Sequence, residues 1–480
     1  ALHGGTSPSG RLLQAARRGL LRGTAGFSSL AHPAVPRARG PLPWAAALVL
    51  FGLGALFGLA VSGSAEARHE SPHEVAVQLG RVLARVEQLY VDPVERSVLL
   101  EGSIKGMVRE LDPHSSYMPP EEYRIFRSDT EGAFGGIGVE VDGSGDALVV
   151  TAPIEGGPAE RAGVRPGDAI VRIDGDELEG VPLARIVRRM RGAPGTKVSL
   201  TVRREGQKEP LTFELTREIV RVTSVAAKRL DGNVLYLRIK QFQERTHAEL
   251  VEAVAAAQRD PRGTFAGVLL DLRTNPGGLV DQATEVADEL LDGGIVFETR
   301  HRGAVLEQVG ARPGGLLRDA PVVALVDEWT ASAAELLAGA LQDQRRALVV
   351  GVPTFGKGII QSILDMPHGA GMALTTARYY TPAGRAIQAV GITPDVLLEG
   401  YRRHPLALRE QDLGGHLQRD PQVLGPPPPK PSRTVRLPEG EEPPVRIDVK
   451  AIPADPTRGK DAALRVAYET LRGLAGRGAR

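Results

Sequence analysis

Ser332 and Lys357 are the two residues of this sequence whose types and surroundings best suit cleavage of an amide bond without histidine. Ser332 follows the apolar run Val322 to Val326, which indicates a buried strand, and precedes an Ala- and Leu-rich helical pattern. A serine at such a strand-to-helix turn lies near free backbone N–H groups and the positive end of a helix dipole, which can both stabilise an oxyanion. A lone serine at a helix start is more often only an N-cap, so the case for a nucleophile depends on its partners.

Lys357 could take the proton of a serine hydroxyl if its amine were neutral. A hydroxyl is a poor nucleophile until a base removes its proton, and a lysine can be that base only where burial keeps it uncharged. Lys357 lies between Phe355 and the pair Ile359 and Ile360, and Gln361 follows closely enough to hold the amine by a hydrogen bond. A single lysine in a glycine turn is usually solvated, and it is the combination with Ser332 that favours catalysis.

The same lysine ends a segment, Gly351–Lys357, that matches most of a phosphate-binding loop. The next position should be a Ser or Thr that binds magnesium, and here it is Gly358. Such a loop should also open a helix, whereas Ile359, Ile360 and Ile363 favour a strand. We therefore predict no nucleotide site at Lys357.

A Ser-His-Asp hydrolase is the other class of protease to consider. The sequence has no G-x-S-x-G motif. Its most motif-like histidine, His114 in D-P-H-S-S, is better interpreted as part of a structural turn.

The segments around Ser332 and Lys357 resemble the carboxyl-terminal processing peptidases, serine endopeptidases that join a PDZ domain to a crotonase-like core. The resemblance covers roughly Arg81 to Leu417. Its motifs, in chain order, are Y-V-D (90–92), G-M-V-R-E-L-D-P-H-S-S-Y (106–117), F-G-G-I-G-V-E-V (134–141), D-L-R-T-N-P-G-G-L (271–279), V-D-E-W-T-A-S-A-A-E (326–335), T-F-G-K-G-I-I-Q (354–361), Y-Y-T-P-A-G-R-A-I-Q (379–388), G-I-T-P-D (391–395) and R-E-Q-D-L-G-G-H-L (409–417). The resemblance implies that Ser332 is the nucleophile, Lys357 the general base and Gln361 the residue that orients the base.

An oxyanion hole needs two hydrogen-bond donors directed at one point. The backbone N–H of Ala333, next to the nucleophile, is the natural first donor. The second should come from a glycine loop elsewhere, and the segment 275–278 follows the apolar strand Val268 to Leu272. Its glycines permit positive φ and close backbone approach. The resemblance implies Gly278 rather than Gly277, although a Pro-Gly-Gly sequence after a strand is more often only a turn.

Residues 132 to about 205 alternate short strands with glycine turns, include a helical stretch at Leu183 to Arg191, and resemble a PDZ domain. The resemblance implies that backbone N–H groups of one loop capture the terminal carboxylate of a peptide. The following strand, Val139 to Val141, would then pair with the peptide by β-augmentation. The residues of that loop are Gly135, Gly136, Ile137 and Gly138.

The remaining core, about Ile219 to Leu398, alternates strands with helices, which predicts an α/β layered fold with parallel pairing. The expected strands are Val234–Ile239, Val268–Leu272, Val322–Val326 and Ala347–Val350, and the expected helices are His247–Arg259, Leu279–Leu291 and Ala331–Gln344. Beyond it, the tetraproline 426–429 indicates an extended linker. A final amphipathic helix, with Leu464, Tyr468 and Leu471 on one face, should pack on the core.

The N-terminal part of the chain indicates export. Several arginines precede an uncharged apolar run from Trp44 to Val61, and Ser64 to Ala67 is typical of a signal-peptidase site. The run is long for a signal peptide and near the minimum for a membrane span, so cleavage and an uncleaved anchor both stay open. In either case the arginines should stay in the cytoplasm and the enzyme outside it. Residues 69 to about 128 have amphipathic helical periodicity, and in the resembled family such a helical arm contributes to dimerisation.

Composition excludes several other functions. A length of 480 residues suggests about three domains plus tails, and a formal net charge of +1 gives no sign of nucleic-acid binding. The absence of cysteine excludes thiol catalysis, thiolate metal sites and disulfides. The ten histidines form no paired metal motif, so we expect neither a metal nor a cofactor.

We therefore predict an α/β multidomain protein, with a crotonase-like protease core, an inserted PDZ domain and an N-terminal helical arm. The predicted segments are a basic leader (1–43), a signal peptide or anchor (44–67), a helical segment (68–130), the PDZ domain (131–218), the Ser-Lys core (219–424), a Pro-rich linker (425–458) and a terminal helix (459–480). The expected function is that of an exported endopeptidase, periplasmic or membrane-anchored, that recognises polypeptide C-termini and cleaves near them. Its expected partners are unfolded or tagged protein substrates, an activating adaptor protein and further copies of the chain in a homo-oligomer. The alternatives are a PDZ-based adaptor with a latent core and a non-proteolytic acyl hydrolase.

Overall fold

The structure is a computed structural model, and it describes residues 71–142, 148–400, 407–421, 423, 425–438, 444 and 447–478. The chain divides into two compact units, Ala1–Leu89 and Tyr90–Arg480. The described part of the first unit is helix α2 (Pro72–Leu89). Ser71 and Glu74 cap this helix, because each donates its backbone N–H to the side chain of the other. The predicted leader (1–43) and signal or anchor segment (44–67) lie outside the described residues.

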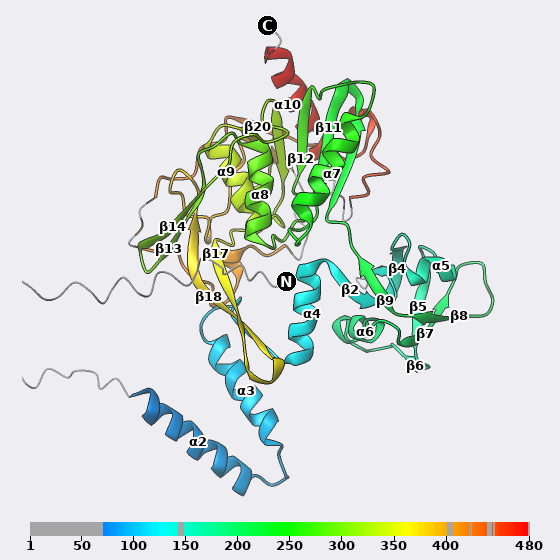
Figure 1. The fold of residues 1–480 in the computed structure, drawn as a ribbon, viewed down its shortest axis with the longest axis vertical. Coiled ribbons are helices and arrows are strands. Elements are labelled where there is room, and N and C mark those ends of the chain that lie inside the picture. The colour runs from blue at the N-terminus through cyan, green and yellow to red at the C-terminus, as the bar shows by residue number, and fades with distance from the viewer. Residues whose placement is uncertain are drawn as a thin grey trace, which may run out of the picture. The chain divides into compact units, whose positions relative to one another are not determined.

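A mixed sheet forms the centre of the second unit (Figure 1). Within the described residues it has seven strands, in the spatial order β10 (Val225–Leu230), β11 (Val234–Ile239), β12 (Gly267–Asp271), β15 (Val322–Val326), β16 (Ala347–Gly351), β19 (Val396–Glu399) and β20 (Arg433–Arg436). β10 and β11 are antiparallel, and every later pair is parallel. Parallel strands buried on both faces read as continuous apolar runs, which is why these segments could be predicted from sequence.

Helices cover both faces of this sheet. Alternate residues of β11 show the division, because Leu235 and Leu237 face one core while Val234 and Tyr236 face the other. The first face packs against α7 (Thr246–Gln258), α8 (Val280–Leu290) and α9 (Ala333–Asp343), and the second packs against α10 (Ala462–Gly478). The predicted strands and helices are thus confirmed, with ends that differ by one or two residues. The predicted packing of Leu464, Tyr468 and Leu471 on the core is confirmed as well.

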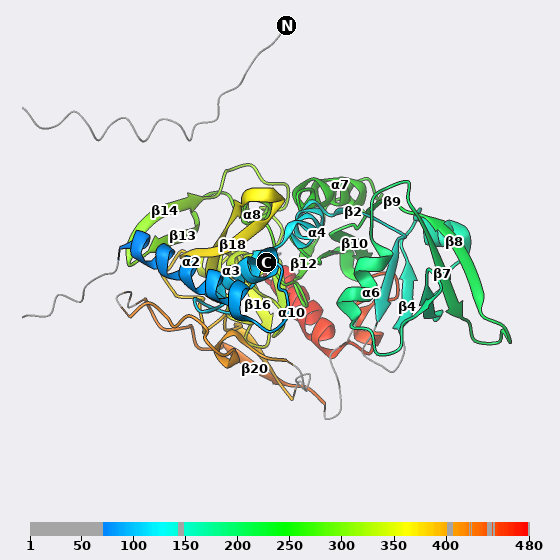
Figure 2. The ribbon, with the colours of Figure 1, turned by 90° about the horizontal axis from the view of Figure 1, so that it is seen from below.

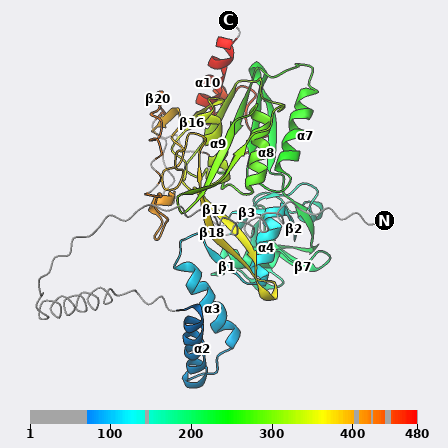
Figure 3. The same cartoon turned by 60° about the vertical axis from the view of Figure 1, so that its left-hand side comes forward.

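A second sheet lies beside the first. Among the described residues it consists of β1 (Ser116–Met118), β18 (Gly371–Tyr380), β13 (Ile295–His301), β14 (Ala304–Gly310) and β17 (Ile359–Asp365). β17 and β18 form a long antiparallel hairpin beside helix α4 (Pro120–Glu131), as Figure 3 shows. Tyr123 of α4 donates a 2.8 Å hydrogen bond to Asp365. Sequence periodicity predicted only helices from residue 69 to about 128. That region contains α3 (Arg96–Arg109) and α4, but β1 lies between them because its backbone pairs with β18.

The inserted domain is a small antiparallel sheet with two helices (Figure 1 and Figure 2). Its described strands are β3 (Val139–Asp142), β4 (Leu148–Pro153), β5 (Ala169–Ile173), β6 (Asp176–Glu177), β7 (Lys197–Arg203) and β8 (Leu211–Thr216), and its helices are α5 (Pro158–Ala162) and α6 (Leu183–Met190). The chain enters and leaves through β2 (Ala133–Gly136) and β9 (Glu218–Arg221), which pair with each other. The predicted α/β core with an inserted domain and an N-terminal helical region is therefore confirmed.

The region predicted as a Pro-rich linker contributes a strand. Arg433–Arg436 form β20, which pairs in parallel with β19 at the edge of the central sheet. Short 3₁₀ turns complete the described elements, namely η3 (Asp231–Asn233), η4 (Pro367–Gly369), η5 (Glu410–Asp412) and η6 (Pro456–Arg458). The prolines alone did not predict this strand, because pairing with β19 depends on an edge that only the folded sheet provides.

Candidate active site

Ser332 lies at the sharp turn between β15 and α9, as the sequence predicted. It is the N-cap of α9 and has φ 55° and ψ −120°, a backbone conformation that is strained for a residue with a side chain. A strained strand-to-helix turn of this kind exposes a nucleophilic serine at the end of a sheet. The neighbouring Ala331 and Ala333 are buried, whereas Ser332 keeps partial access to solvent.

The glycine loop after β12 lies directly against this turn. Thr330 donates its hydroxyl to the Leu272 carbonyl at 2.9 Å, and the Ala331 N–H donates to the Asn275 carbonyl at 2.9 Å. Gly277 approaches so closely that a Cβ atom there would lie 2.7 Å from Cβ of Ser332. Its φ of +100° also requires glycine. The fold therefore brings together two segments that are far apart in the sequence.

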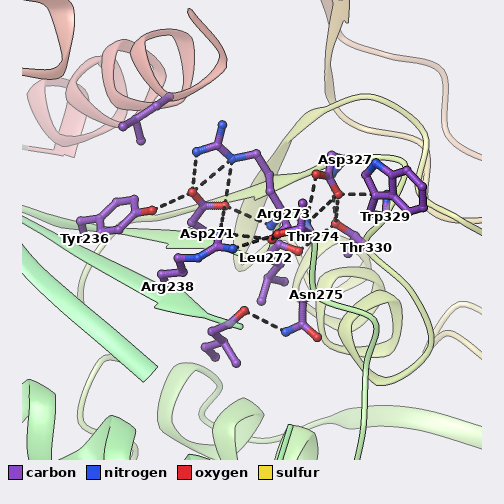
Figure 4. A network of polar contacts seen from close by, with 12 residues as sticks. Tyr236, Arg238, Asp271, Leu272, Arg273, Thr274, Asn275, Asp327, Trp329 and Thr330 are labelled. Carbon is purple, nitrogen blue, oxygen red and sulfur yellow. Dashed lines mark hydrogen bonds and ion pairs between the residues drawn. The ribbon is translucent and has the colours of Figure 1, made fainter. Parts of the chain in front are cut away.

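Asp327 connects the two loops by hydrogen bonds (Figure 4). Its carboxylate accepts the backbone N–H of Thr274 at 2.9 Å and that of Trp329 at 3.0 Å. Burial raises the pKa of Asp327 to about 6, although the hydrogen bond from Thr274 opposes this shift. Asp327 thus fixes the nucleophile turn against the glycine loop.

A buried ion-pair cluster lies between the end of β12 and the glycine loop (Figure 4). Arg273 donates to Asp271 at 2.6 Å and to Asp461, the residue that precedes α10, at 2.9 Å. Burial acts to raise the pKa of Asp271, but the guanidinium groups of Arg273 and Arg238 and the Tyr236 hydroxyl together outweigh burial and hold this pKa below its ordinary value. The cluster links the end of β12 to the start of the C-terminal helix.

Two backbone N–H groups in this region have no acceptor within the described residues, namely those of Gly278 and Ala333. On either side of Gly278, Phe242 donates to the Gly277 carbonyl and Leu279 donates to the Phe242 carbonyl, both at 2.8 Å. The N–H of Gly277 is occupied, because it donates to the Asn275 side chain at 2.8 Å. The geometry therefore favours Gly278 over Gly277 as an oxyanion donor, and this role of Gly278 stays a prediction.

Lys357 lies in the loop before β17, and its surroundings suit a neutral amine. Its Nζ donates to Oε1 of Gln361 at 2.9 Å, which is the hydrogen bond predicted from sequence. Burial lowers the pKa of Lys357 below its ordinary value, while the nearby carboxylates of Glu410, Asp112 and Glu335 act in the opposite direction. The loop leads into a strand rather than a helix, which agrees with the rejection of a phosphate-binding loop.

The buried carboxylate of Glu335 joins the nucleophile to the base, and sequence reasoning missed it. One carboxylate oxygen accepts the backbone N–H of Ser332 at 2.9 Å and that of Lys357 at 2.8 Å. The other oxygen accepts the N–H of Gly356 at 2.7 Å and the hydroxyl of Thr354. Burial raises the pKa of Glu335 to about 7, against the effect of these four hydrogen bonds. The S-x-x-E spacing from Ser332 was a signal for a capping residue, but not for a contact with Lys357.

Replacing Glu335 by glutamine is expected to loosen this connection. An amide has one accepting oxygen where the carboxylate has two, so its NH₂ group would face N–H donors that then lack an acceptor. Such buried unsatisfied groups cost about 1–3 kcal/mol, and misplacement of reacting groups by about 1 Å can cost about 10²-fold in rate. We expect Glu335→Gln to lower both the melting temperature and kcat. A variant that melts earlier but keeps the wild-type kcat would show that Glu335 only stabilises the fold.

The glycines predicted to bind a peptide carboxylate have two different environments. Gly135 and Gly136 are strand residues of β2 and pair with β9. The prediction that they belong to an open loop is therefore wrong. A Cβ at Gly135 would lie 2.1 Å from the Gly192 carbonyl oxygen, so close packing requires glycine there.

Ile137 and Gly138 connect β2 to β3. Their carbonyls accept N–H groups of the inserted domain at 2.9 Å, and Gly138 has φ +74°. β3 pairs with β4 on one side and forms the edge of its sheet within the described residues. The strand expected to bind a peptide is therefore correctly placed at a sheet edge.

The described residues contain neither a candidate metal site nor a candidate membrane span. No group of three or more His, Asp or Glu side chains there could hold a metal ion. No helix in the same part of the chain is long and apolar enough to cross a membrane.

Family models match successive parts of the chain. The model of peptidase family S41 matches residues 233–398, and a PDZ-domain model matches 149–204. A model described as the N-terminal domain of the activating protease CtpB matches 60–122.

Individual proteins give the same result. The carboxy-terminal-processing protease of Bartonella bacilliformis is 40% identical over 356 residues, which span 73% of this chain and 82% of that protein. The carboxyl-terminal-processing protease of Picosynechococcus sp. is 39% identical over 289 residues, which span 59% of this chain and 69% of that protein. Among solved structures, the photosystem II D1 C-terminal processing protease is 30% identical, covers 69% of this chain and 95% of its own, and has a TM-score of 0.42.

The fold and these matches define a serine-type peptidase with an S41 core and a PDZ domain. Within that class, the chain belongs to the carboxyl-terminal processing peptidases. The resemblance inferred from the sequence motifs is confirmed.

Proposed function

We propose that this protein is an exported endopeptidase in which Ser332 is the nucleophile and Lys357 the general base. The observation that carries the proposal is the Glu335 carboxylate, because one of its oxygens accepts the backbone N–H of both residues. The segments that contain Ser332 and Lys357 are therefore hydrogen-bonded to the same carboxylate oxygen. The lowered pKa of Lys357 supports its role as a base, since only the neutral amine can accept a proton.

The proposed reaction proceeds by acyl transfer. The Lys357 amine takes the hydroxyl proton while Oγ of Ser332 attacks the carbonyl carbon of the scissile peptide bond. The N–H groups of Gly278 and Ala333 stabilise the oxyanion of the tetrahedral intermediate. The Lys357 ammonium then gives its proton to the leaving amine, and an acyl-enzyme is left on Ser332. Water, deprotonated by the neutral Lys357, releases the acyl group in the second half of the reaction.

Gln361 supports this chemistry by orientation. Its amide oxygen accepts from Nζ of Lys357, and its amide nitrogen donates to the His114 carbonyl at 2.7 Å. Because both ends of the amide are engaged, the side chain has one orientation. The hydrogen bond to Gln361 therefore holds the Lys357 amine in one orientation.

The PDZ domain is proposed to select substrates by their free C-terminus. The support is the position of β3 at the edge of its sheet, within the described residues, and the positive-φ turn at Gly138 before it. An extended peptide could add a strand at this edge, with its terminal carboxylate at the N–H groups of the turn. The substrates are then unfolded or tagged proteins with accessible C-termini.

Amidation of the substrate terminus is expected to weaken binding and slow cleavage. Hydrogen bonds to a charged group contribute about 1.5–3 kcal/mol each, and about 1.4 kcal/mol corresponds to a tenfold change in affinity. The dissociation constant of an amidated peptide should therefore be about ten- to a hundredfold higher than that of the free acid. Binding can be measured by fluorescence anisotropy, and cleavage by mass spectrometry with the Ser332→Ala variant as background. Equal binding and cleavage of the two forms would show that the domain does not recognise the carboxylate.

Helix α2 supports a proposal of homo-oligomers or adaptor binding. None of its residues is buried, and the apolar Val75, Leu79 and Val82 are exposed by 39%, 46% and 56%. An apolar face of this kind usually packs against a partner. Export is proposed from the arginine-rich and apolar N-terminal sequence alone.

A further inference from the structure

Two sequence motifs supply no reacting group in the proposed chemistry, and both lie near the base. The first is D-P-H-S (112–115), which precedes β1, and the second is R-E-Q-D-L-G-G-H-L (409–417), which begins at η5. In the sequence they lie on opposite sides of residues 233–398, the part of the core that the S41 family model matches. His114 and Glu410 are separated by 296 positions, yet Nε2 of His114 lies 2.7 Å from Oε2 of Glu410. A carboxylate oxygen accepts, so the proton of this bond is on the imidazole nitrogen.

A closed chain of hydrogen bonds runs from the base through both motifs and back. It begins at Lys357, whose Nζ donates to Gln361, and Nε2 of Gln361 donates to the backbone carbonyl of His114 at 2.7 Å. The His114 ring then donates to Glu410. We call this set of contacts, together with those that Gln388 makes with Glu410 and Gly358, the base ring.

Gln388 closes the base ring. Its Nε2 donates to Oε1 of Glu410 at 2.7 Å, and its Oε1 accepts the backbone N–H of Gly358 at 2.9 Å. Gly358 follows Lys357 directly in the chain, so the ring returns to the residue next to the base. The side chains of Glu410 and Gln388 are almost fully buried. Polar groups in such surroundings need their partners, because an unsatisfied buried group is costly.

Both motifs are anchored independently of the ring. The Asp112 carboxylate accepts the N–H groups of His114 and Ser115, each at 2.8 Å, and the strand β1 that follows pairs with β18. On the other side, the N–H of Glu410 donates to the Phe355 carbonyl at 3.0 Å. Backbone hydrogen bonds therefore fix both segments of the base ring, and its geometry does not depend on a single side-chain rotamer.

We infer that His114 and Glu410 are positioning residues for the general base, and that the base ring couples the base to segments on both sides of the core. This inference rests on the proposed role of Lys357. His114 acts through its carbonyl, which fixes the Gln361 amide, and Glu410 acts by holding the His114 ring and Gln388. Docking of the segment before β1 and of the segment at η5 is then part of the assembly of the active site.

The charge of Glu410 also acts on the pKa of Lys357, which a purely structural residue would not do. The carboxylates that face Lys357 are Glu410 on η5, Asp112 before β1 and Glu335 on α9, and each favours the protonated amine. Burial favours the neutral amine and outweighs them. Removing the Glu410 charge should therefore lower the pKa of Lys357 further.

Two substitutions of Glu410 distinguish the effect of its charge from the effect of its hydrogen bonds to His114 and Gln388. Glu410→Gln keeps the size of the side chain and one oxygen that can accept from Gln388, and its NH₂ group can donate to Nε2 of His114 in the other neutral tautomer. It removes the charge, so the acid limb of the pH–kcat profile should shift to lower pH. Glu410→Ala opens the ring and should lower kcat about 10²-fold with little change in KM, because the base is misplaced. Glu399→Gln, at the exposed end of β19, is the matched control and should behave as the wild type.

A second measurement requires no activity. In the full chain labelled with ¹³C at lysine Cε, the Lys357 signal can be assigned by its absence in Lys357→Arg and titrated. The inference predicts a lower Lys357 pKa in Glu410→Gln than in the wild type. Identical titration curves, or a folded Glu410→Ala variant with wild-type kcat, would overturn it. A shifted titration in a protein that hydrolyses no substrate would support the base ring and would count against the proposed protease function alone.

Discussion

Replacing Lys357 by arginine is expected to reduce hydrolysis to background, a loss on the order of 10⁴-fold or more by analogy with other serine hydrolases that lose their base. A guanidinium keeps its proton at every pH of interest, so it cannot accept one from Ser332. Lys357→Ala should be equally inactive, whereas Gln361→Ala should lose less because that residue only orients the amine. The measurement is kcat with an unfolded protein substrate.

The matched control for this variant is Lys450→Arg, since the Lys450 side chain is 92% exposed. It should retain full activity. The wild type should also gain activity as pH rises, because the neutral form of Lys357 is the active one. The lowered pKa places this rise below the range of an ordinary lysine. Turnover by Lys357→Arg at the wild-type rate would contradict the assignment of the base.

Replacing Gly278 by alanine should have the second-largest effect. Gly278 has φ +129°, and a Cβ atom there would lie 2.1 Å from the carbonyl oxygen of Phe242, so the loop must move. The N–H of Gly278 would then no longer point at the oxyanion. Loss of one oxyanion donor typically costs about 10²–10³-fold in kcat, and we expect a loss of this size with KM nearly unchanged.

Gly314→Ala provides the control for the backbone strain of this substitution. Gly314 also has positive φ, but a Cβ there would meet no atom within 4 Å, and the residue is exposed. It should cost some stability and no activity. If Gly278→Ala were folded and as active as Gly314→Ala, the second oxyanion donor would have to be sought elsewhere.

The local part of the site could be predicted from the sequence. The apolar run Val322–Val326 predicted the strand before Ser332 because a parallel strand is buried on both faces. The spacing of Lys357 and Gln361 predicted their hydrogen bond because both residues belong to one short segment. Features of this kind depend on neighbours in the chain.

The supporting contacts could not be predicted because they join distant segments. Glu335 showed only a helix-capping pattern, and its contact with Lys357 depends on how the loop before β17 folds back. His114 was interpreted as a turn residue, which describes its backbone, but its ring binds a residue 296 positions away. Likewise, β1 and β20 are strands because of the sheets that accept them and not because of their own periodicity.

The central claim is that Ser332 attacks peptide bonds, and one comparison tests it most directly. The full chain and its Ser332→Ala variant are incubated with a disordered protein, and the products are identified by mass spectrometry. The substitution removes only the hydroxyl, so both proteins should fold and bind substrate alike. We predict fragments from the wild type and intact substrate from Ser332→Ala. The same fragments at the same rate from both proteins would contradict the account.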